Sequence, residues 1–252
     1  MSRLARWELK QAWRSFRIPG FWLLLLFFAL MDPPVIKYME QIVARFGGGI
    51  QIQMPQPTPR LAMTQFLQDL TQIAGFVLVL LAAGSLANER GLANWYLAQP
   101  VKRAEYLLGK WLALVSMIVV GGLVSGLLCF LYSWSLLGSF SFGLALKAIV
   151  GTIAFLLYLA SASFLGSALF PFAGAGTFGF LVGFGGFLLS APAQALGIYQ
   201  YFPQSAAAYV ADILAGTYPV RDYLWGIFSC LVLAGIFVVL AVYFFDRREL
   251  AN

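Results

Sequence analysis

Histidine is absent from the 252-residue chain, and cysteine occurs only twice. The lack of histidine excludes histidine proton relays, histidine metal ligands and Ser–His catalysis. Cys129 and Cys230 each lie within an apolar run and have no neighbouring ligand at metal-binding spacing, so we interpret them as small buried residues. The sequence therefore predicts no metal site and no catalytic residue.

Charged side chains are also scarce. They make up 10% of the residues against 61% for hydrophobic side chains, and the mean hydropathy is +0.84. A soluble domain of this size cannot bury so much apolar surface, so the bilayer must be its solvent. The net charge of +6 reflects where the charges lie along the chain, and we expect no nucleic-acid partner. We predict one all-α integral membrane domain over residues 1–252, in contact with membrane lipid.

Six apolar runs are long enough, or nearly long enough, to cross a bilayer as helices. The predicted spans are Phe21–Tyr38, Gln72–Ala87, Trp111–Leu136, Leu144–Phe170, Ala175–Leu196 and Tyr223–Phe245. Residues 39–69 contain a triple glycine and three alternating prolines, which predicts a loop outside the membrane, with a short returning helix as an option near its end. Residues 197–222 hold apolar fragments too short to span, which is typical of re-entrant or interfacial helices.

Five basic residues precede Pro19, spaced so that they share one face of a helix. Residues 1–19 therefore predict a basic amphipathic helix along an anionic membrane surface, ended by Pro19-Gly20; the alternative is a solvated basic start. The helix, residues 88–110 and the C-terminus together carry eleven Lys and Arg, against five on the other side. This bias places both termini and residues 88–110 in the cytoplasm, and residues 39–69 and 197–222 outside it.

Glycine and one acid give the candidate sites inside the spans. Gly122 and Gly126 have the spacing of small residues at a close helix contact, and so do Gly179 and Gly183 in the glycine-rich fifth span. These four glycines mark either tight helix packing or a moving gate. Asp32 lies past the middle of the first span, where it faces a cavity or partner, or touches the outer headgroups because the helix is short or tilted. It is the possible intramembrane polar site.

Residues 88–110 combine several charges with a strong local pattern. A short apolar, partly aromatic helix that includes Trp95 and Tyr96 stops at Pro100, and a second helix runs into the next span. The segment resembles the cytoplasmic loop of ABC-2 type transporter permeases. The matching residues are Glu89, Gly91, Leu97, Pro100, Val101, Arg103, Leu107, Leu108, Gly109 and Lys110. The family often has Thr after the glycine, where this chain has Leu92.

The resemblance implies an ABC-2 exporter-like fold of six transmembrane helices after an N-terminal interfacial helix, in a bacterial or archaeal cell membrane. It implies that residues 88–110 couple the chain to a separate ABC ATP-binding subunit through Glu89, Gly91, Leu92, Trp95, Tyr96, Pro100 and Arg103. It also implies a second permease copy or paralogue, and export as the direction. The chain has no P-loop, so we expect it to bind no cofactor itself, while the partner holds ATP and Mg.

Two other classes of function remain open at this point. An intramembrane enzyme would need histidine, clustered acids or a metal, and Asp32 is the one acid expected at membrane depth. A secondary transporter, independent of an ATPase, would need buried ionisable groups or unwound helices near mid-depth. The break at Asp32-Pro33-Pro34 and the glycine-rich fifth span favour that alternative.

Overall fold

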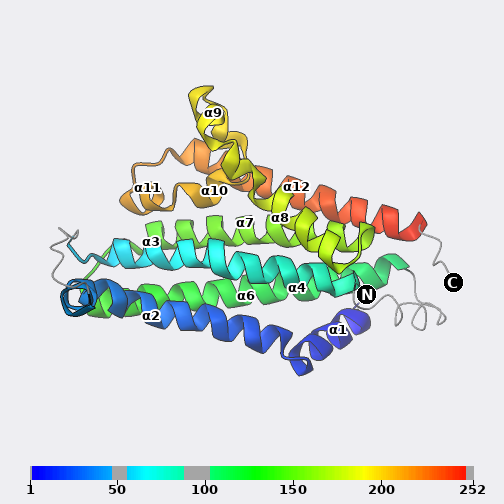
Figure 1. Cartoon of the computed structure of the whole chain (residues 1–252), viewed down its shortest axis with the longest axis horizontal. Coiled ribbons are helices and arrows are strands. Elements are labelled where there is room, and N and C mark those ends of the chain that lie inside the picture. Colours follow the sequence, from blue (N-terminus) through cyan, green and yellow to red (C-terminus); the bar gives the residue numbers. More distant parts are fainter. Residues whose placement is uncertain (1, 47–55, 88–102, 248–252) are drawn as a thin grey trace.

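The computed structural model describes residues 2–46, 56–87 and 103–247. Every regular element within these ranges is a helix, and the long helices lie side by side in a bundle (Figure 1). The elements are α1 (Ser2–Arg14), α2 (Arg17–Phe46), α3 (Pro59–Asp69), the π-helix η1 (Leu70–Ala74), α4 (Gly75–Ala87), α6 (Arg103–Leu137), α7 (Phe142–Leu169), α8 (Phe172–Leu188), α9 (Ser190–Ala195), the 3₁₀-helix η2 (Tyr199–Tyr201), α10 (Ser205–Ala208), α11 (Val210–Ala215) and α12 (Val220–Arg247).

The bundle has two distinct ends. The helix α1 lies at one end, where α4 and α12 also finish and α6 begins, and we call this the terminal end (Figure 1). At the opposite end, which we call the loop end, α2 finishes and α3 and α7 begin. The short helices α10 and α11 also lie towards the loop end (Figure 1).

Among the described residues, five helical stretches are long and apolar enough to cross a membrane: Arg17–Val43, Pro59–Ala87, Ala104–Leu137, Phe142–Leu169 and Val220–Arg247. The predicted fifth span, 175–196, differs, because it is divided at Leu189 into α8 and α9. Pro192 explains the break, since a continuous helix would require an N–H on Pro192 and would bring its ring against the Leu188 carbonyl. The 17 residues of α8 form a shorter apolar helix.

The amphipathic helix at the N-terminus is shorter than predicted. It ends at Arg14 rather than at Pro19-Gly20, and α2 begins at Arg17. Phe16 makes the turn with a left-handed φ of 58°. Pro19 falls in the first turn of α2, where a missing N–H costs no helical hydrogen bond. Proline therefore marks the start of the next helix here, not the end of the first.

The stretch predicted as a loop, residues 39–69, is largely helical in its described part. The helix α2 continues to Phe46, and α3 begins at Pro59. Thr58 caps α3 by accepting a hydrogen bond from the Leu61 N–H at 3.2 Å, and Pro59 occupies the first position, which suits it. Through η1, α3 continues into α4, so the second long helix starts 13 residues before the predicted Gln72.

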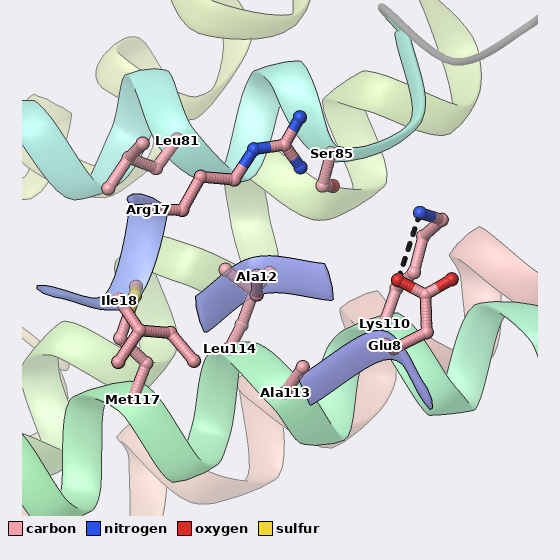
Figure 2. Close-up of a pocket in the computed structure, with 10 residues that line it drawn as sticks. All are labelled: Glu8, Ala12, Arg17, Ile18, Leu81, Ser85, Lys110, Ala113, Leu114 and Met117. Atoms are coloured by element: carbon pink, nitrogen blue, oxygen red, sulfur yellow. Dashed lines mark hydrogen bonds and ion pairs between the residues drawn. The ribbon is translucent and has the colours of Figure 1, made fainter. Parts of the chain in front are cut away.

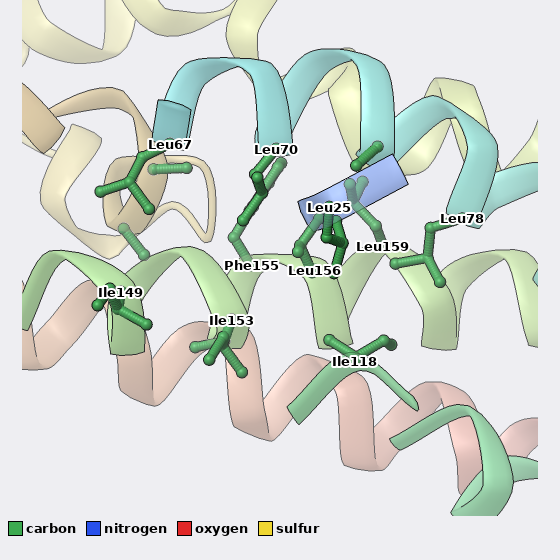
Figure 3. Packing of buried hydrophobic residues seen from close by; sticks show 14 of the residues in the cluster. Leu25, Leu67, Leu70, Leu78, Ile118, Ile149, Ile153, Phe155, Leu156 and Leu159 are labelled. Carbon is green, nitrogen blue, oxygen red and sulfur yellow. The ribbon is translucent and has the colours of Figure 1, made fainter. Parts of the chain in front are cut away.

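The centre of the bundle is α7. It packs against α4, α6, α8 and α12. In its most apolar stretch, 89% of the helix is buried inside the protein. Figure 3 shows buried side chains of α7, among them Phe155, Leu156 and Leu159, meeting leucines of the α3–α4 helix. A helix that is apolar all round must be surrounded by other helices or by lipid, and α7 takes the first solution.

Residues 199–215 form the short helices η2, α10 and α11, which pack on the long helices. The backbone of Ala206 approaches α7 so closely that a Cβ on Gly151 would lie 2.9 Å from its carbonyl oxygen. The Tyr223 hydroxyl donates to the Lys147 carbonyl at 2.7 Å, and the Cys230 thiol donates to the Pro203 carbonyl at 3.2 Å. The approach at Gly151 places the segment against α7, the Cys230 bond ties it to α12, and the Tyr223 bond joins α12 to α7.

Candidate functional site

Most of the predicted coupling residues lie outside the described part of the chain: Glu89, Gly91, Leu92, Trp95, Tyr96 and Pro100. Arg103 is the first residue of α6. The described helices on either side of this segment, α4 and α6, both meet it at the terminal end, next to α1 (Figure 1). The geometry of the site is therefore built from α1, the start of α2, the end of α4 and the start of α6.

A buried ion pair fixes α1 to the start of α6. The Lys110 Nζ lies 3.2 Å from the Glu8 Oε2, and only 4% and 7% of the two side chains are exposed. The same ammonium group lies 4.9 Å from the centre of the Tyr106 ring, one turn earlier on α6, which adds a cation–π contact. Removing one partner of such a pair leaves an uncompensated buried charge, so the pair holds the two helices in register.

Beside the ion pair is a small cavity of about 40 Å³. Figure 2 shows Arg17 extending along α4 towards Ser85, on the side of the cavity opposite Met117 and Leu114 of α6. A cavity of this size can hold a water molecule but no organic substrate. It is therefore a small gap between helices, lined mainly by apolar side chains, rather than a substrate pocket.

Two tryptophans complete the junction of α1, α2 and α6. The Trp22 indole N–H donates to the Met117 carbonyl at 3.0 Å, and its ring meets that of Trp13 edge-on at 5.6 Å between centroids. Gly121 makes room for the ring, because a Cβ there would lie 2.7 Å from the Trp22 Cδ1. The sequence did not single out Glu8 or Trp22, and no periodicity in α1 distinguishes Glu8 from a solvated acid.

The predicted glycines of α6 lie against α7. A Cβ on Gly122 would lie 2.8 Å from the Ile153 Cγ1, and one on Gly126 would lie 2.8 Å from the Ile149 Cγ1. Both distances are shorter than real Cβ contacts. The two glycines therefore permit an approach between α6 and α7 that a larger residue would prevent.

The predicted glycines of α8 also lie against α7. A Cβ on Gly179 would lie 2.8 Å from the Ser163 Cα, and one on Gly183 would meet the Leu159 side chain. The α7–α8 contact is further fixed by the Tyr158 hydroxyl, which donates to the Val182 carbonyl at 2.7 Å. These residues occupy a packed interface.

Asp32 is directed into the protein and not towards a headgroup region. Only 6% of the residue is exposed, and its Oδ2 has no hydrogen-bond donor within the described structure. The neighbouring charged group is the carboxylate of Asp69, at the end of α3. The charge of Asp32 also acts on Cys129 of α6, whose Sγ lies 3.9 Å from the Ser133 Oγ. Sequence reasoning missed Asp69 because it assigned that residue to the loop.

A group of three or more His, Cys, Asp or Glu that could hold a metal ion does not occur among the described residues. Three tyrosines contact one another next to the short helices: Tyr199 and Tyr209 meet edge-on with ring centroids 5.7 Å apart, and Tyr209 and Tyr218 stack at 4.7 Å. Burial, with a smaller effect from Tyr209, raises the pKa of Tyr199 to about 12. Tyr199 is therefore neutral at physiological pH and acts as a packing group.

No family model matches the chain. Its sequence is similar to the uncharacterized transmembrane protein YxlG of Bacillus subtilis (strain 168), with 27% identity over 182 residues, or 69% of this chain and 70% of that protein. This similarity agrees with the five apolar helices of membrane-spanning length. The chain is a multi-pass membrane protein.

In a multi-pass membrane protein, the large apolar side chains on the outside of the bundle contact lipid. Leu23 of α2, Leu181 of α8 and Val239 of α12 are exposed to 73%, 61% and 68%, which would be unfavourable in water over so many positions. Charged side chains are instead found in the interior at two places, which are the Glu8–Lys110 ion pair and Asp32. Buried ionisable groups in such a protein are costly, so these two places are the ones at which function is to be sought.

Proposed function

We propose that this membrane protein is the permease subunit of an ATP-binding cassette transporter. The supporting observation is that Lys110, the last residue of the ABC-2-like segment 88–110, forms a buried ion pair with Glu8 of α1. The segment that resembles the family's coupling loop thus continues directly into the best-anchored junction at the terminal end. An ATPase that moved this segment would act on α6 and α1 together.

The coupling follows from the stiffness of the helices. Arg103 begins α6, which continues without interruption to Leu137. Lys110 ties this helix to α1, and the Met117 carbonyl ties it to Trp22 of α2. A displacement of the start of α6 would therefore carry α1 and α2 with it, and would reach α7 through the close contacts at Gly122 and Gly126.

The proposal includes the partners that the resemblance implies. A separate ATP-binding subunit would hold ATP and Mg, and a second copy of the chain or a related permease would complete the translocation path. Both termini would face the cytoplasm, and export would be the direction. The 11-to-5 distribution of Lys and Arg between the two sides supports this orientation.

The second candidate function is a secondary transporter that needs no ATPase. One observation favours it, which is the buried Asp32 beside Asp69 within the membrane-spanning helices. Intramembrane acids are common in proton-coupled carriers. The two candidates differ in whether an ATPase binds the chain at the terminal end.

The test is to isolate the tagged full chain from its native membranes in mild detergent and to identify an ATP-binding cassette protein bound to it. We then expect Trp95→Ala combined with Tyr96→Ala to leave the chain in the membrane but to release the ATPase. Truncating each such aromatic anchor typically costs ~2 kcal/mol or more. The double variant should therefore bind the ATPase at least about 30-fold more weakly even if only one anchor is used.

The matched control removes an aromatic pair from the other end of the molecule. Tyr201 and Trp225 meet edge-on at 5.4 Å, and Tyr201→Ala with Trp225→Ala should leave ATPase binding unchanged. Full recovery of the ATPase by the Trp95/Tyr96 variant at equal membrane levels would contradict the proposal. Purification without any ATP-binding cassette protein would favour the secondary transporter.

A further inference from the structure

The buried carboxyl group of Asp32 has an unsatisfied oxygen. Asp32 lies in the middle of α2, directly before Pro33 and Pro34, and is 6% exposed. Its Oδ2 is completely buried and has no hydrogen-bond partner within the described structure. A buried acceptor without a donor is costly, and an ionised one far more so.

The partner that faces Asp32 is a second acid. Asp69 of α3, a helix that packs against α2, is the charged group that acts on Asp32. The Gln65 amide, one turn earlier on α3, donates to both carboxylate oxygens of Asp69, at 3.3 and 3.2 Å. Asp69 is thus held as an acceptor. Two ionised carboxylates have no hydrogen to share, so a hydrogen bond between these two side chains would need a proton on one of them.

No cation compensates this pair within the described residues. The elements packed against α2 are α1, α3, η1, α4 and α6. The titratable groups that they present to Asp32 are Asp69 from α3 and Cys129 from α6, and Cys129 is itself beside Ser133. Neither supplies positive charge. A group of three or more His, Cys, Asp or Glu arranged so that it could hold a metal ion does not occur in the described part of the chain.

We propose that Asp32 and Asp69 form a carboxylic acid–carboxylate pair that binds one proton inside the membrane domain. Asp32 holds the proton on Oδ2 and donates it in a hydrogen bond to Asp69, which remains ionised and oriented by Gln65. The proton satisfies the orphan oxygen and reduces the charge of the pair from two to one. When the pair releases it, the proton leaves by way of Asp69, which is partly exposed, to water.

Release of the proton changes the contact between α2 and α3. Two neighbouring negative charges in the interior repel, and the buried one loses its only compensation. On the Asp69 side, the regular α-helix ends at this residue, because the π-helix Leu70–Ala74 begins at the next one. We expect the helix to adjust most easily at this point. Such π-segments are irregular points in a helix and frequently occur at functional sites. This site does not depend on the proposed ATPase partner, and its test uses the chain alone.

The first experiment is infrared spectroscopy of the purified full chain in detergent, titrated with acid and base. A protonated carboxyl group has a C=O stretch distinct from that of a carboxylate. We expect this band at neutral pH in the wild-type protein, and its loss in Asp32→Asn. In Asp69→Asn the band should shift, because a neutral acceptor replaces the carboxylate. Asp212→Asn, which changes an exposed acid on α11, is the control and should leave the band unchanged.

The second experiment measures thermal stability as a function of pH, and it does not depend on resolving the carboxyl band in the infrared spectrum. The folded pair holds a proton that the unfolded chain releases at lower pH, so the stability of the wild-type protein should fall as pH rises. Asn keeps the shape of a protonated Asp and its donor capacity, so Asp32→Asn should fold and should lose this part of the pH dependence.

Three outcomes would overturn the inference. The first is the absence of a protonated carboxyl band at neutral pH, and the second is a band that persists in Asp32→Asn. The third is a stabilisation of the wild-type protein, but not of Asp32→Asn, by NaCl or CaCl₂ at constant ionic strength. That result would make the pair a cation site instead of a proton site.

Discussion

Adding one methyl group at Gly179 should separate α8 from α7. The Cβ of an alanine at this position would lie 2.8 Å from the Ser163 Cα, whereas ordinary contacts begin at 3.4 Å. The two backbones would have to move apart by about 0.6 Å, because a Cα cannot rotate away as a side chain can. Van der Waals packing would then be weakened along the whole α7–α8 interface.

The same helix provides a graded series. Gly183 meets only the flexible Leu159 side chain at close range, with the Leu159 Cα 4.0 Å away, so Gly183→Ala should be milder. A Cβ on Gly185 would have nothing within 4 Å, and one on Gly176 would make only an ordinary contact of 3.7 Å with Leu80. We expect Gly179→Ala to cost about 1–3 kcal/mol through overpacking. Gly185→Ala should be neutral or stabilising by up to ~1 kcal/mol, since alanine favours a helix interior.

The measurement is unfolding of the purified chain in mixed micelles with increasing SDS, followed by the fluorescence of its seven tryptophans. The expected order of stability is Gly185→Ala first, then Gly176→Ala, Gly183→Ala and Gly179→Ala. Gly183→Leu should be more damaging than any of these, whereas Leu188→Ile on the exposed end of α8 should be mild. Equal stability of Gly179→Ala and Gly185→Ala would refute the interpretation of these glycines as packing residues.

The remaining predictions concern the terminal end. Glu8→Gln leaves Lys110 buried without its carboxylate at a cost of ~3–5 kcal/mol, so amide hydrogen exchange in α1 should accelerate about 100-fold or more. Glu8→Gln combined with Lys110→Met should recover much of that loss, and strictly additive effects would show that the pair is not coupled. In a chain with Cys129 and Cys230 replaced, a cysteine at position 95 should react with an impermeant reagent only from the cytoplasmic side, and labelling from outside intact cells would contradict the predicted orientation.

The long apolar helices could be predicted from the sequence because they are controlled by one strong signal. A run of some twenty apolar residues has few alternatives to a helix in a membrane or core, so the spans at Trp111–Leu136, Leu144–Phe170 and Tyr223–Phe245 lie within α6, α7 and α12 or end within a residue of them. Proline was the less certain guide. It ends α7 before Pro171, but it lies inside α2 at Pro33-Pro34 and begins α2 and α3.

The polar contacts could not be predicted because each depends on a partner distant in sequence. Glu8 and Lys110 are 102 residues apart, and no local pattern indicates that the start of α6 lies against α1. Asp69 was not singled out because residues 39–69 were placed outside the membrane, with only a short returning helix as an option near their end, and Gln65, Gln68 and Asp69 made that end look polar. The apolar positions at Ala62, Met63 and Phe66 carried the signal of a buried helical face.

Lys110 ties α6 to α1, and Cys129 of the same helix is influenced by Asp32, so α6 connects the proposed function to the proposed proton site. Lys110 lies on the first turns of α6, and Cys129, which faces Asp32, lies 19 residues later, or roughly 28 Å along the helix at ~1.5 Å per residue. Between them, Gly121, Gly122 and Gly126 place the helix in close contact with α2 and α7. A rotation of α6 imposed at its first turn would therefore be resisted along its length by those contacts and would be felt at Cys129. If the ATPase moves α6, proton occupancy of Asp32–Asp69 should differ between nucleotide states of the complex, whereas an α6 that stays fixed would leave the protonated carboxyl band the same in every state.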